Sequence, residues 1–479
     1  MTWSAKLKYI STRGQAEALD FEGVLMAGLA RDGGLYVPEA FPKFDAADFR
    51  AMRGLSYPQI ALKVMKPFVG GSIGEADLKK IIDEAYSTFV HREVSPLVQV
   101  GANHFVMQLY HGPTLAFKDV AMQVLGRFYD HVLEKRDKHI TVVGATSGDT
   151  GSAAIEAIRG RSRASIFIMH PHNRTSEVQR RQMTTVLAPN VHNIAVKGTF
   201  DDCQNILKAM FNDHAFRDEI ALSGVNSINW ARIMPQIVYY IAAAVQLGAP
   251  DREISFTVPT GNFGDIFAGY CAKQMGLPIR RLVIASNSND ILTRVINTGE
   301  HKLGQVHPTI SPSMDIQISS NFERLLFDVY GRDGAKIAKL MQELGETGTF
   351  NVDLAPLEKA RELFSAHRVS EEETLAAIRK VHEQTEMLVD PHTAVGVEAA
   401  WRELAEGDNA ATPMVTLSTA HPAKFPENVE KATGVRPPLP AHLASLYEKQ
   451  ERFEVLANDV DVVKAHIAKK LAEEAQVSS

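Results

Sequence analysis

The sequence of 479 residues lacks the features that mark secreted, metal-binding or membrane proteins. Its only cysteines are Cys203 and Cys271, so no Cys-x-x-Cys pair and no zinc-ligand spacing occur, and we expect no metal site. Both cysteines fall in segments with an apolar helical face, which predicts buried structural thiols. The first residues, MTWSAKLKYISTRGQAEALDF, contain no apolar core of a secretory signal.

Long hydrophobic runs and an excess of either charge are also missing. The longest apolar stretch, Ile237 to Val245, is well short of the ~20 residues that a membrane-spanning helix needs. The 51 basic and 57 acidic residues nearly balance, which argues against a nucleic-acid-binding coat. We therefore expect a cytoplasmic protein with neither membrane nor nucleic acid as a partner.

What the sequence does contain is an alternation of short apolar runs with amphipathic stretches, beginning near residue 139. Such an alternation is typical of parallel β-sheets with helices on their faces, and it predicts an α/β fold. The strand candidates are Ile140–Val143, Ser165–Met169, Asn193–Val196, Phe256–Val258, Leu282–Ala285 and Met414–Leu417.

The chain is long enough for two or three domains. Residues 1–95 carry fewer strand signals and predict a separate N-terminal unit. Residues 139–224 predict a smaller α/β domain inserted into a larger one, which comprises residues 96–138 and 225–440. Residues 441–479 have the pattern of a polar, amphipathic helical tail.

Lys118 is the first residue with a chemical role to consider. It opens a helical pattern directly after the apolar run Leu115-Ala116-Phe117, where partial burial would lower the pKa of its amine. A neutral lysine amine is the group that Schiff-base chemistry requires. The alternative is a solvated lysine, which is the commoner role of this residue type.

The segment Pro259-Thr-Gly-Asn-Phe-Gly-Asp265 lies between a predicted strand and a predicted helix. Gly261 and Gly264 allow backbone N–H groups to gather around an anion at the positive end of the helix. No lysine follows, as it would in a Walker loop, so a small fixed phosphate suits the segment better than a nucleotide. A tight turn without a ligand remains the alternative.

A third segment, Gly144-Ala-Thr-Ser-Gly-Asp-Thr-Gly151, occupies the same kind of strand-to-helix position. The hydroxyl groups and amides of Ser147, Asp149 and Thr150 could hold a carboxylate at the helix N-terminus. Capping of the helix by one of these three side chains is the simpler alternative.

Together these segments resemble those of the threonine synthases, which are pyridoxal-phosphate enzymes of fold type II. The resemblance covers nearly the whole chain, and further matching motifs carry it: GLARDGGLYVP (28–38), HGPTLAFKD (111–119), NSINWAR (226–232), ASNSNDIL (285–292), SPSMDI (311–316) and STAHPAKF (418–425). The resemblance implies two parallel-sheet α/β domains of the tryptophan synthase β-like kind and, over residues 1–95, the family's N-terminal domain.

The resemblance also implies roles for individual residues. Lys118 would carry pyridoxal 5'-phosphate as a Schiff base, and Thr419 would place its hydroxyl at the pyridine nitrogen. The remaining implied sites are the cofactor-phosphate loop of Gly261, Asn262, Phe263, Gly264 and Asp265, the substrate-carboxylate loop of Ser147, Asp149 and Thr150, and, for the substrate phosphate, Arg232 and Asn289. For Arg232 a structural ion pair is the alternative.

The implied reaction converts O-phospho-L-homoserine and water into L-threonine and phosphate, by γ-elimination followed by addition of water at the β-carbon. The alternatives are a related phospho-lyase or dehydratase, and a degenerate homologue that only binds the cofactor. The expected partner is the small-molecule substrate, in a monomer or a homodimer. His111, His392 and His421 lie beside turns and are expected to be structural rather than catalytic.

Overall fold

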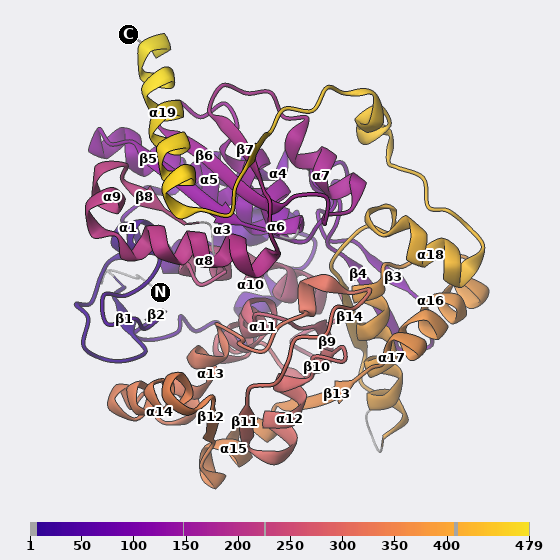
Figure 1. Ribbon diagram of the computed structural model, residues 1–479. Helices are drawn as coiled ribbons and strands as arrows, with labels where there is room; N and C mark the ends of the chain where they lie inside the picture. The colour runs from indigo at the N-terminus through magenta and orange to yellow at the C-terminus, as the bar shows by residue number, and fades with distance from the viewer. Residues whose placement is uncertain (1–6, 147, 225–226, 407–410, 479) are drawn as a thin grey trace. The chain divides into compact units, whose positions relative to one another are not determined.

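The computed structural model describes residues 7–146, 148–224, 227–406 and 411–478. Contacts between Cα atoms divide the chain into two units. The large unit comprises Met1–Ala121 and Ser227–Pro437, and the small unit comprises Met122–Asn226 and Pro438–Ser479. Each unit is built around its own β-sheet, as Figure 1 shows.

The sheet of the large unit has six strands in the order β13-β10-β9-β14-β4-β3. All neighbours are parallel except β3, which pairs antiparallel with β4 at the edge. The strands are β3 (Leu97–Gln99), β4 (His104–Gln108), β9 (Ile254–Pro259), β10 (Ile279–Ser286), β13 (Phe364–Arg368) and β14 (Met414–Ser418). Because the five parallel strands share one direction, their carboxyl ends lie at one edge of the sheet.

Both faces of this sheet are covered by helices. On β10, Val283 packs in an apolar cluster with residues of α17 (Pro391–Ala405). The neighbouring Leu282 faces α11 (Gly264–Gln274), because a Cβ on Gly269 of that helix would lie 3.0 Å from the Leu282 side chain. Successive residues of a strand point to opposite faces, so α17 and α11 cover different sides. The N-terminal segment adds β1 and β2, which pair antiparallel.

The large unit contains many further elements. They are β1 (Tyr9–Ser11), α1 (Phe21–Ala27), β2 (Tyr36–Pro38), α2 (Ala46–Arg50), α3 (Tyr57–Val69), α4 (Glu75–Tyr86), α10 (Trp230–Gln246), α11 (Gly264–Gln274), α12 (Ile291–Thr298), β11 (Glu300–Lys302), η1 (Pro312–Met314), α13 (Phe322–Val329), α14 (Gly334–Thr347), β12 (Thr349–Asn351), α15 (Leu354–Arg361), α16 (Glu371–Thr385), α17 (Pro391–Ala405), η3 (Pro422–Lys424) and α18 (Pro426–Thr433). Helix α5 (Lys118–Arg136) begins in this unit and continues in the small one.

The small unit holds a five-stranded, fully parallel sheet in the order β15-β7-β6-β5-β8. Its elements are β5 (Ile140–Ala145), α6 (Asp149–Ile158), β6 (Ala164–Pro171), α7 (Glu177–Thr184), β7 (Val191–Val196), α8 (Phe200–Asn212), α9 (His214–Glu219), β8 (Leu222–Ser223), η4 (Ala441–Leu443), η5 (Leu446–Glu448), β15 (Glu454–Leu456) and α19 (Val460–Ser478). The predicted α/β class with parallel sheets is confirmed.

The C-terminal segment is part of the small unit's core. Strand β15 extends the sheet by pairing with β7, and Val463 and Ile467 of α19 are buried in the same apolar cluster as Phe167 and Met210. Helix α19 is in contact with α8, and in Figure 1 its lower end lies near that helix. Among the residues that the structure describes, no helix is long and apolar enough to cross a membrane.

Candidate active site

The candidate site residues of the large unit follow the carboxyl ends of four neighbouring strands. Lys118 comes after β4, the 260–265 loop after β9, Asn289 after β10 and Thr419 after β14. Ligands of open α/β sheets bind outside the carboxyl ends of the strands. The topology therefore brings these separate motifs to one edge of the sheet.

Lys118 and Thr419 are joined through the backbone. The N–H of Phe117, one residue before Lys118, donates to the carbonyl of Thr419 at 2.8 Å. Ala116 and Ala420 form a β-bridge, and the N–H of His421 donates to the Leu115 carbonyl at 3.0 Å. The first turn of α5 is thus fixed against the segment that follows β14.

A buried polar brace holds the turn before Lys118. Thr114 donates to the Asp119 carboxylate from both its backbone N–H and its hydroxyl, each at 2.8 Å. Lys424, which is fully buried, donates to the Thr114 carbonyl at 2.8 Å. Leu115 within this turn has a φ of 63°, a left-handed conformation that is rare for a leucine. The brace offsets that strain and leaves Lys118 at the start of α5.

The 260–265 loop directs its amides away from its supporting segment. The carbonyl of Gly261 accepts from the Ser319 hydroxyl at 2.7 Å, and that of Asn262 accepts from the backbone and side-chain N–H groups of Asn321 at 3.1 and 2.9 Å. In a trans peptide the N–H points opposite to the carbonyl. The N–H groups of Asn262 and Phe263 therefore face away from residues 319–321.

These amides meet the start of helix α11. Phe263 caps the helix in a left-handed conformation, with a φ of 61°, and its side chain makes no capping hydrogen bond. The first N–H groups of a helix have no partner within it and carry its positive end. The donors at this turn fit a phosphate group.

Gly261 is required by the packing behind the loop. A Cβ at this position would lie 2.7 Å from the carbonyl oxygen of Ser313. The N–H of Ser313 in turn donates to Nε2 of His392 at 3.1 Å, and Nδ1 of that histidine bonds the Asp390 carboxylate at 2.7 Å. The loop therefore rests on a segment fixed by a buried histidine–aspartate pair.

The carboxyl group of Asp265 lies in the interior of the large unit. Its Oδ1 accepts hydrogen bonds from the hydroxyls of Tyr239, in a short contact, and Tyr240, at 3.2 Å. Burial raises the pKa of Asp265 to about 7, while the two tyrosine hydroxyls and the charge of Lys118 act to lower it. Lys118 and Asp265 are therefore electrostatic neighbours.

The residues at this edge suit pyridoxal phosphate. The convergent N–H groups at the start of α11 match a phosphate, and the neighbouring lysine and threonine match an aldehyde and a ring nitrogen. Lys118 also lies 5.0 Å from the ring centre of the adjacent Phe117, which provides an apolar side to its surroundings. The donor set of this chain fits the cofactor implied by its sequence.

The third motif lies in the small unit. Ser147 is outside the described residues. Gly148 is the residue directly before α6 and has a φ of 152°, and a Cβ there would lie 2.5 Å from the Gln179 side chain. Gln179 donates to Asp149 at 2.9 Å, and the Thr146 hydroxyl accepts from the Gly148 and Gly151 N–H groups. Thr150 is partly exposed on the first turn of α6.

The two residues expected to meet the substrate phosphate differ in their surroundings. Arg232 is 3% exposed on the first turn of α10. Asn289 donates to Asn287, Asp315 and the His307 carbonyl, and its own carbonyl accepts from the His307 N–H. The Asn289 amide is therefore engaged within the chain, and its proposed role would require these bonds to rearrange.

The three histidines set aside in the sequence have structural partners. His392 supports Ser313, as described above. Nε2 of His111 bonds Gln108 at 2.9 Å, and Nδ1 of His421 accepts from the Ala423 N–H at 3.1 Å. Cys203 and Cys271 are free and buried, as predicted, and burial raises the pKa of both thiols.

Sequence reasoning missed Tyr239 and Tyr240. Both lie in the apolar stretch Ile237–Val245, whose length alone indicates only that it is too short to span a membrane. The sequence does contain a signal for them, because two adjacent tyrosines in an apolar helix need hydrogen-bond partners for their hydroxyls. The partner itself, Asp265, could be identified only from the fold.

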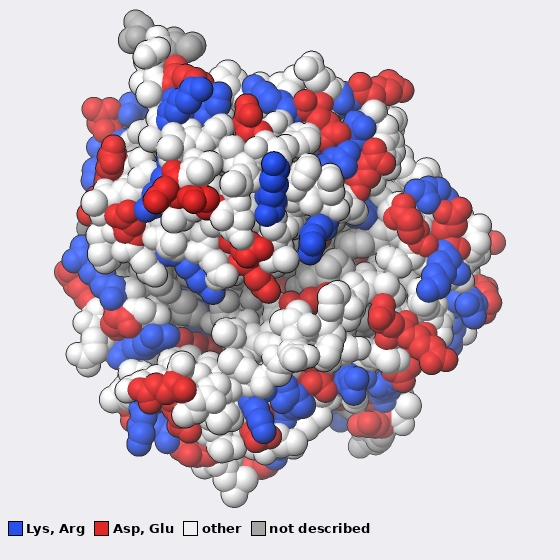
Figure 2. Space-filling model, in the orientation of Figure 1, with Lys and Arg blue, Asp and Glu red and all other residues white. Residues whose placement is uncertain are grey.

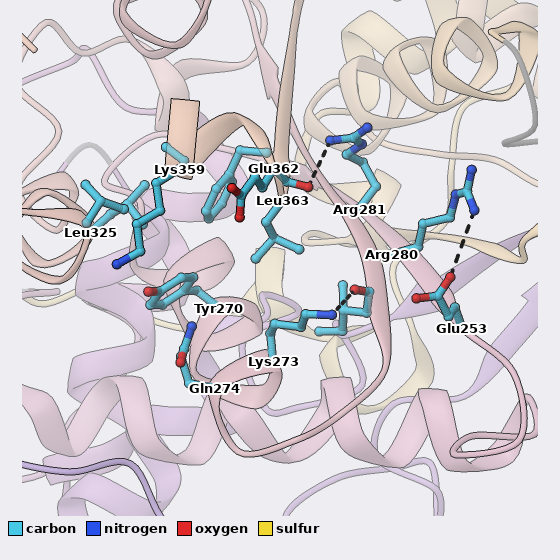
Figure 3. Close-up of a pocket in the computed structure, with 14 residues that line it drawn as sticks. Glu253, Tyr270, Lys273, Gln274, Arg280, Arg281, Leu325, Lys359, Glu362 and Leu363 are labelled. Carbon is cyan, nitrogen blue, oxygen red and sulfur yellow. Dashed lines mark hydrogen bonds and ion pairs between the residues drawn. The ribbon is translucent and has the colours of Figure 1, made fainter. Parts of the chain in front are cut away.

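A cavity of about 530 Å³ in the large unit lies at the other end of the sheet. Its lining includes Glu253, Ile279 and Phe364, which precede or begin β9, β10 and β13 (Figure 3). Arg280 pairs with Glu253 at 3.9 Å, and Lys273 donates to the Ile279 carbonyl at 2.7 Å. None of the candidate active-site residues that the structure describes lines this cavity.

Comparisons with known proteins agree with this geometry. The family models that match are those of the Threonine synthase N terminus at residues 8–86, the Pyridoxal-phosphate dependent enzyme family at 91–419 and Threonine synthase, C-terminal, at 393–467. A threonine synthase from Pseudomonas aeruginosa is 56% identical over 463 residues, covering 96% of this chain and 98% of the relative.

Solved structures of two threonine synthases resemble the chain throughout its length. The pyridoxal-phosphate-bound enzyme from Brucella melitensis has a TM-score of 0.94 and 56% identity, covering 97% of this chain and 99% of its own. The yeast enzyme has a TM-score of 0.92 and 41% identity, with coverage of 98% and 99%.

Proposed function

The chain belongs to the threonine synthase family of pyridoxal-phosphate-dependent lyases, which act in threonine biosynthesis, and we propose that Lys118 holds the cofactor and serves as the base of its reaction. The overall reaction converts O-phospho-L-homoserine and water into L-threonine and phosphate. One observation supports the assignment most strongly: Lys118, Thr419 and the 260–265 loop converge at one edge of a single sheet.

Lys118 is suited to move the proton next to the substrate amine. When bound, pyridoxal phosphate supplies a conjugated ring that stabilises the negative charge left on carbon by removal of a proton. The Thr114–Asp119 brace and the Phe117–Thr419 hydrogen bond hold the first turn of α5, so that the lysine amine starts from a fixed position. A base held in one orientation avoids the entropic cost of finding its proton.

The other residues of the large unit would bind and orient. Backbone N–H groups of Gly261, Asn262, Phe263, Gly264 and Asp265 would hold the cofactor phosphate at the start of α11. The Thr419 hydroxyl would face the ring nitrogen. A hydroxyl, unlike a carboxylate, does not hold that nitrogen permanently protonated, which moderates the electron demand on the substrate.

Substrate binding is assigned to two places. Ser147, Asp149 and Thr150, at the start of α6, would receive the substrate carboxylate, because a helix N-terminus favours an anion. Arg232 and Asn289 would receive the substrate phosphate. We further propose that the enzyme acts in the cytoplasm as a monomer or homodimer and binds no nucleic acid. On the face in Figure 2, basic and acidic side chains are interspersed.

The test is to incubate the purified protein and a Lys118→Ala variant with O-phospho-L-homoserine and to quantify threonine and phosphate together. Equal amounts of both products from the wild type, and neither from the variant, are expected. A wild type that binds the cofactor but releases neither product would contradict the proposed substrate. A Lys118→Ala variant with wild-type turnover would contradict the role of the lysine.

The second candidate function is that of a phospho-lyase or dehydratase that shares the lysine and the 144–151 motif. The same incubation separates the two, because a phospho-lyase would release phosphate together with a keto acid and ammonia instead of threonine. The N-terminal family model at residues 8–86 favours threonine synthase.

A further inference from the structure

Asp390 divides the two oxygens of its carboxylate between two neighbouring residues. Oδ2 accepts a hydrogen bond from the backbone N–H of His392 at 2.9 Å and lies 2.7 Å from Nδ1 of the same residue. Oδ1 accepts from the backbone N–H of Thr393 at 3.1 Å and, in a short contact, from its hydroxyl. The carboxylate is fully buried at the N-terminus of α17, and these contacts use the four acceptor sites that it has. Each oxygen therefore serves one residue.

The contact with Oδ2 determines which nitrogen of the His392 ring carries the proton. The backbone N–H of Ser313 can only donate, so Nε2 of His392, at 3.1 Å, is the acceptor. A ring whose Nε2 accepts has its proton on Nδ1, which is the nitrogen that faces the Asp390 carboxylate. The ring is buried and packs edge-on against Phe425, with 4.9 Å between the ring centres. Asp390 thus holds His392 as an acceptor of fixed orientation.

Ser313 connects this histidine to the candidate phosphate loop. Its N–H is held by His392, and its carbonyl oxygen would lie 2.7 Å from a Cβ on Gly261. The carbonyl of Gly261 is held separately, by the Ser319 hydroxyl at 2.7 Å. A shift of Ser313 would therefore press on Gly261 or leave a space behind it, and the N–H groups that follow Gly261 would move with the loop.

We propose that His392, oriented by Asp390, is a positioning residue that holds the 260–265 loop in the conformation that binds the cofactor phosphate. This inference rests on the proposed function, which assigns that loop to the phosphate. Donors that bind an anion must stay within about 0.5 Å of their productive positions, so the support behind the loop contributes to affinity. In this role His392 acts through Ser313 and not on the cofactor itself.

The test compares two ligands that differ only in the phosphate group. The dissociation constants of pyridoxal 5'-phosphate and of pyridoxal are measured by visible absorbance on the full-length protein after removal of its cofactor. Their ratio is the phosphate preference. His392→Leu should lower this preference by about tenfold, because it leaves the Ser313 N–H without its acceptor. Weaker binding of both ligands with an unchanged preference would assign His392 to stability alone and overturn the proposal.

A conservative variant at the same position tests the hydrogen bond itself. The side-chain oxygen of His392→Gln can accept from the Ser313 N–H, so this variant should keep the phosphate preference within about threefold of the wild type. A loss equal to that of His392→Leu would show that the acceptor has no effect, and would overturn the proposal.

Thr393→Val is a matched control. Thr393 is adjacent to His392, is also buried, and bonds the same carboxylate, but through Oδ1. Its hydroxyl meets Ser418 at 2.9 Å and makes no bond to Ser313. Thr393→Val should therefore leave the phosphate preference unchanged. A loss as large as that of His392→Leu would assign the effect to general loosening at the start of α17 and overturn the proposal.

The role of Asp390 is tested by combining substitutions. Asp390→Ala should lower the phosphate preference by a similar factor, and adding His392→Leu to it should lower the preference no further, because the two residues act as one unit. Losses that simply multiply would overturn the role of Asp390 as the residue that orients His392. If Asp390→Ala does not fold, the comparison of His392→Leu with His392→Gln still decides the proposal.

Gly261→Ala separates this inference from the function on which it rests. If Gly261→Ala lowers the phosphate preference and His392→Leu does not, only the role of His392 is refuted. If neither substitution lowers it, the assignment of the 260–265 loop to the cofactor phosphate is wrong, and the inference is refuted with it.

Discussion

At the scale of single residues, the candidate site depends on a glycine whose lack of a Cβ allows close packing. Gly261 has no Cβ, and the space that one would occupy contains the Ser313 carbonyl oxygen at 2.7 Å. Contacts this short do not occur for real Cβ atoms, so the loop must move to accept one. The amides that we assign to the cofactor phosphate would move with it.

We therefore expect Gly261→Ala to weaken binding of pyridoxal phosphate by at least about tenfold. The dissociation constant can be measured by titrating the cofactor and recording its visible absorbance. Gly345→Ala in α14 is the control, because a Cβ there meets nothing within 4 Å and should leave the constant unchanged. Equal constants for Gly261→Ala and the wild type would show that the loop does not hold the cofactor through its backbone.

A residue could be predicted from the sequence when its partners lie close to it along the chain. The sequence alone singles out Lys118 and the 260–265 loop because each signal lies within a short segment, and their roles stay predictions. The roles of Asp390 and Tyr239 could not be predicted, because they depend on residues far along the chain. Asp390 bonds Thr393, which in turn bonds Ser418, and Tyr239 bonds Asp265. The roles assigned to Thr419, Arg232, Asn289 and the 147–150 segment stay predictions as well.

At the scale of elements, the buried parallel strands were the easiest to predict, since residues covered on both faces form continuous apolar runs. Strand β13 has no continuous apolar run, because its residues include Ser365 and His367, and the sequence pattern does not predict it. Both side chains hydrogen-bond the buried Glu403 of α17, at 2.8 and 3.1 Å. Their polar groups are therefore bonded inside the protein and do not mark a solvent-exposed segment. Strand β15 has only three residues at a sheet edge and is too short to give a pattern.

The C-terminal helix gives a stability prediction at the same scale. Val463 of α19 is fully buried in the small unit's core, whereas the adjacent Val462 is 42% exposed. Val463→Ala should lower the free energy of unfolding by about 2 kcal/mol, and Val462→Ala by less than about 0.5 kcal/mol. Urea denaturation of the two variants measures both values. Equal losses would show that α19 is not packed as part of the core.

At the scale of the whole molecule, buried ionisable groups set how stability depends on pH. Burial lowers the pKa of four histidines, His104, His111, His170 and His301, to about 4 in the folded chain. The unfolded chain therefore binds more protons between pH 6.5 and 4, and stability is lost as the pH falls through this window. Asp265 and Glu156 act in the opposite direction, since burial raises the pKa of both carboxyls and this costs stability as the pH rises.

Because four histidines oppose two carboxyls, we expect the cofactor-free protein to become less stable from pH 6.5 to 4.5. His104→Gln should reduce this loss by about 2 kcal/mol, because it removes one of the four histidines. Urea denaturation at a series of pH values measures the slope. A slope that is unchanged by the substitution would mean that His104 is not buried in its neutral form.

The likeness to threonine synthases extends over nearly the whole chain, from residue 8 to residue 467. Within it, the expected boundaries at residues 95, 139 and 224 stay predictions. The separation of the candidate site from the cavity in Figure 3 follows from strand direction alone, because the two lie at opposite ends of the same strands.

The most direct test is to run the reaction in water labelled with oxygen-18. If phosphate leaves by cleavage of its bond to carbon and water then adds at the β-carbon, each threonine gains one labelled oxygen in its hydroxyl group, and the phosphate gains none. Mass spectrometry of both products reads the result. Labelled phosphate with unlabelled homoserine would mean cleavage between phosphorus and oxygen, and would contradict the assignment of Lys118 and its neighbours to an elimination.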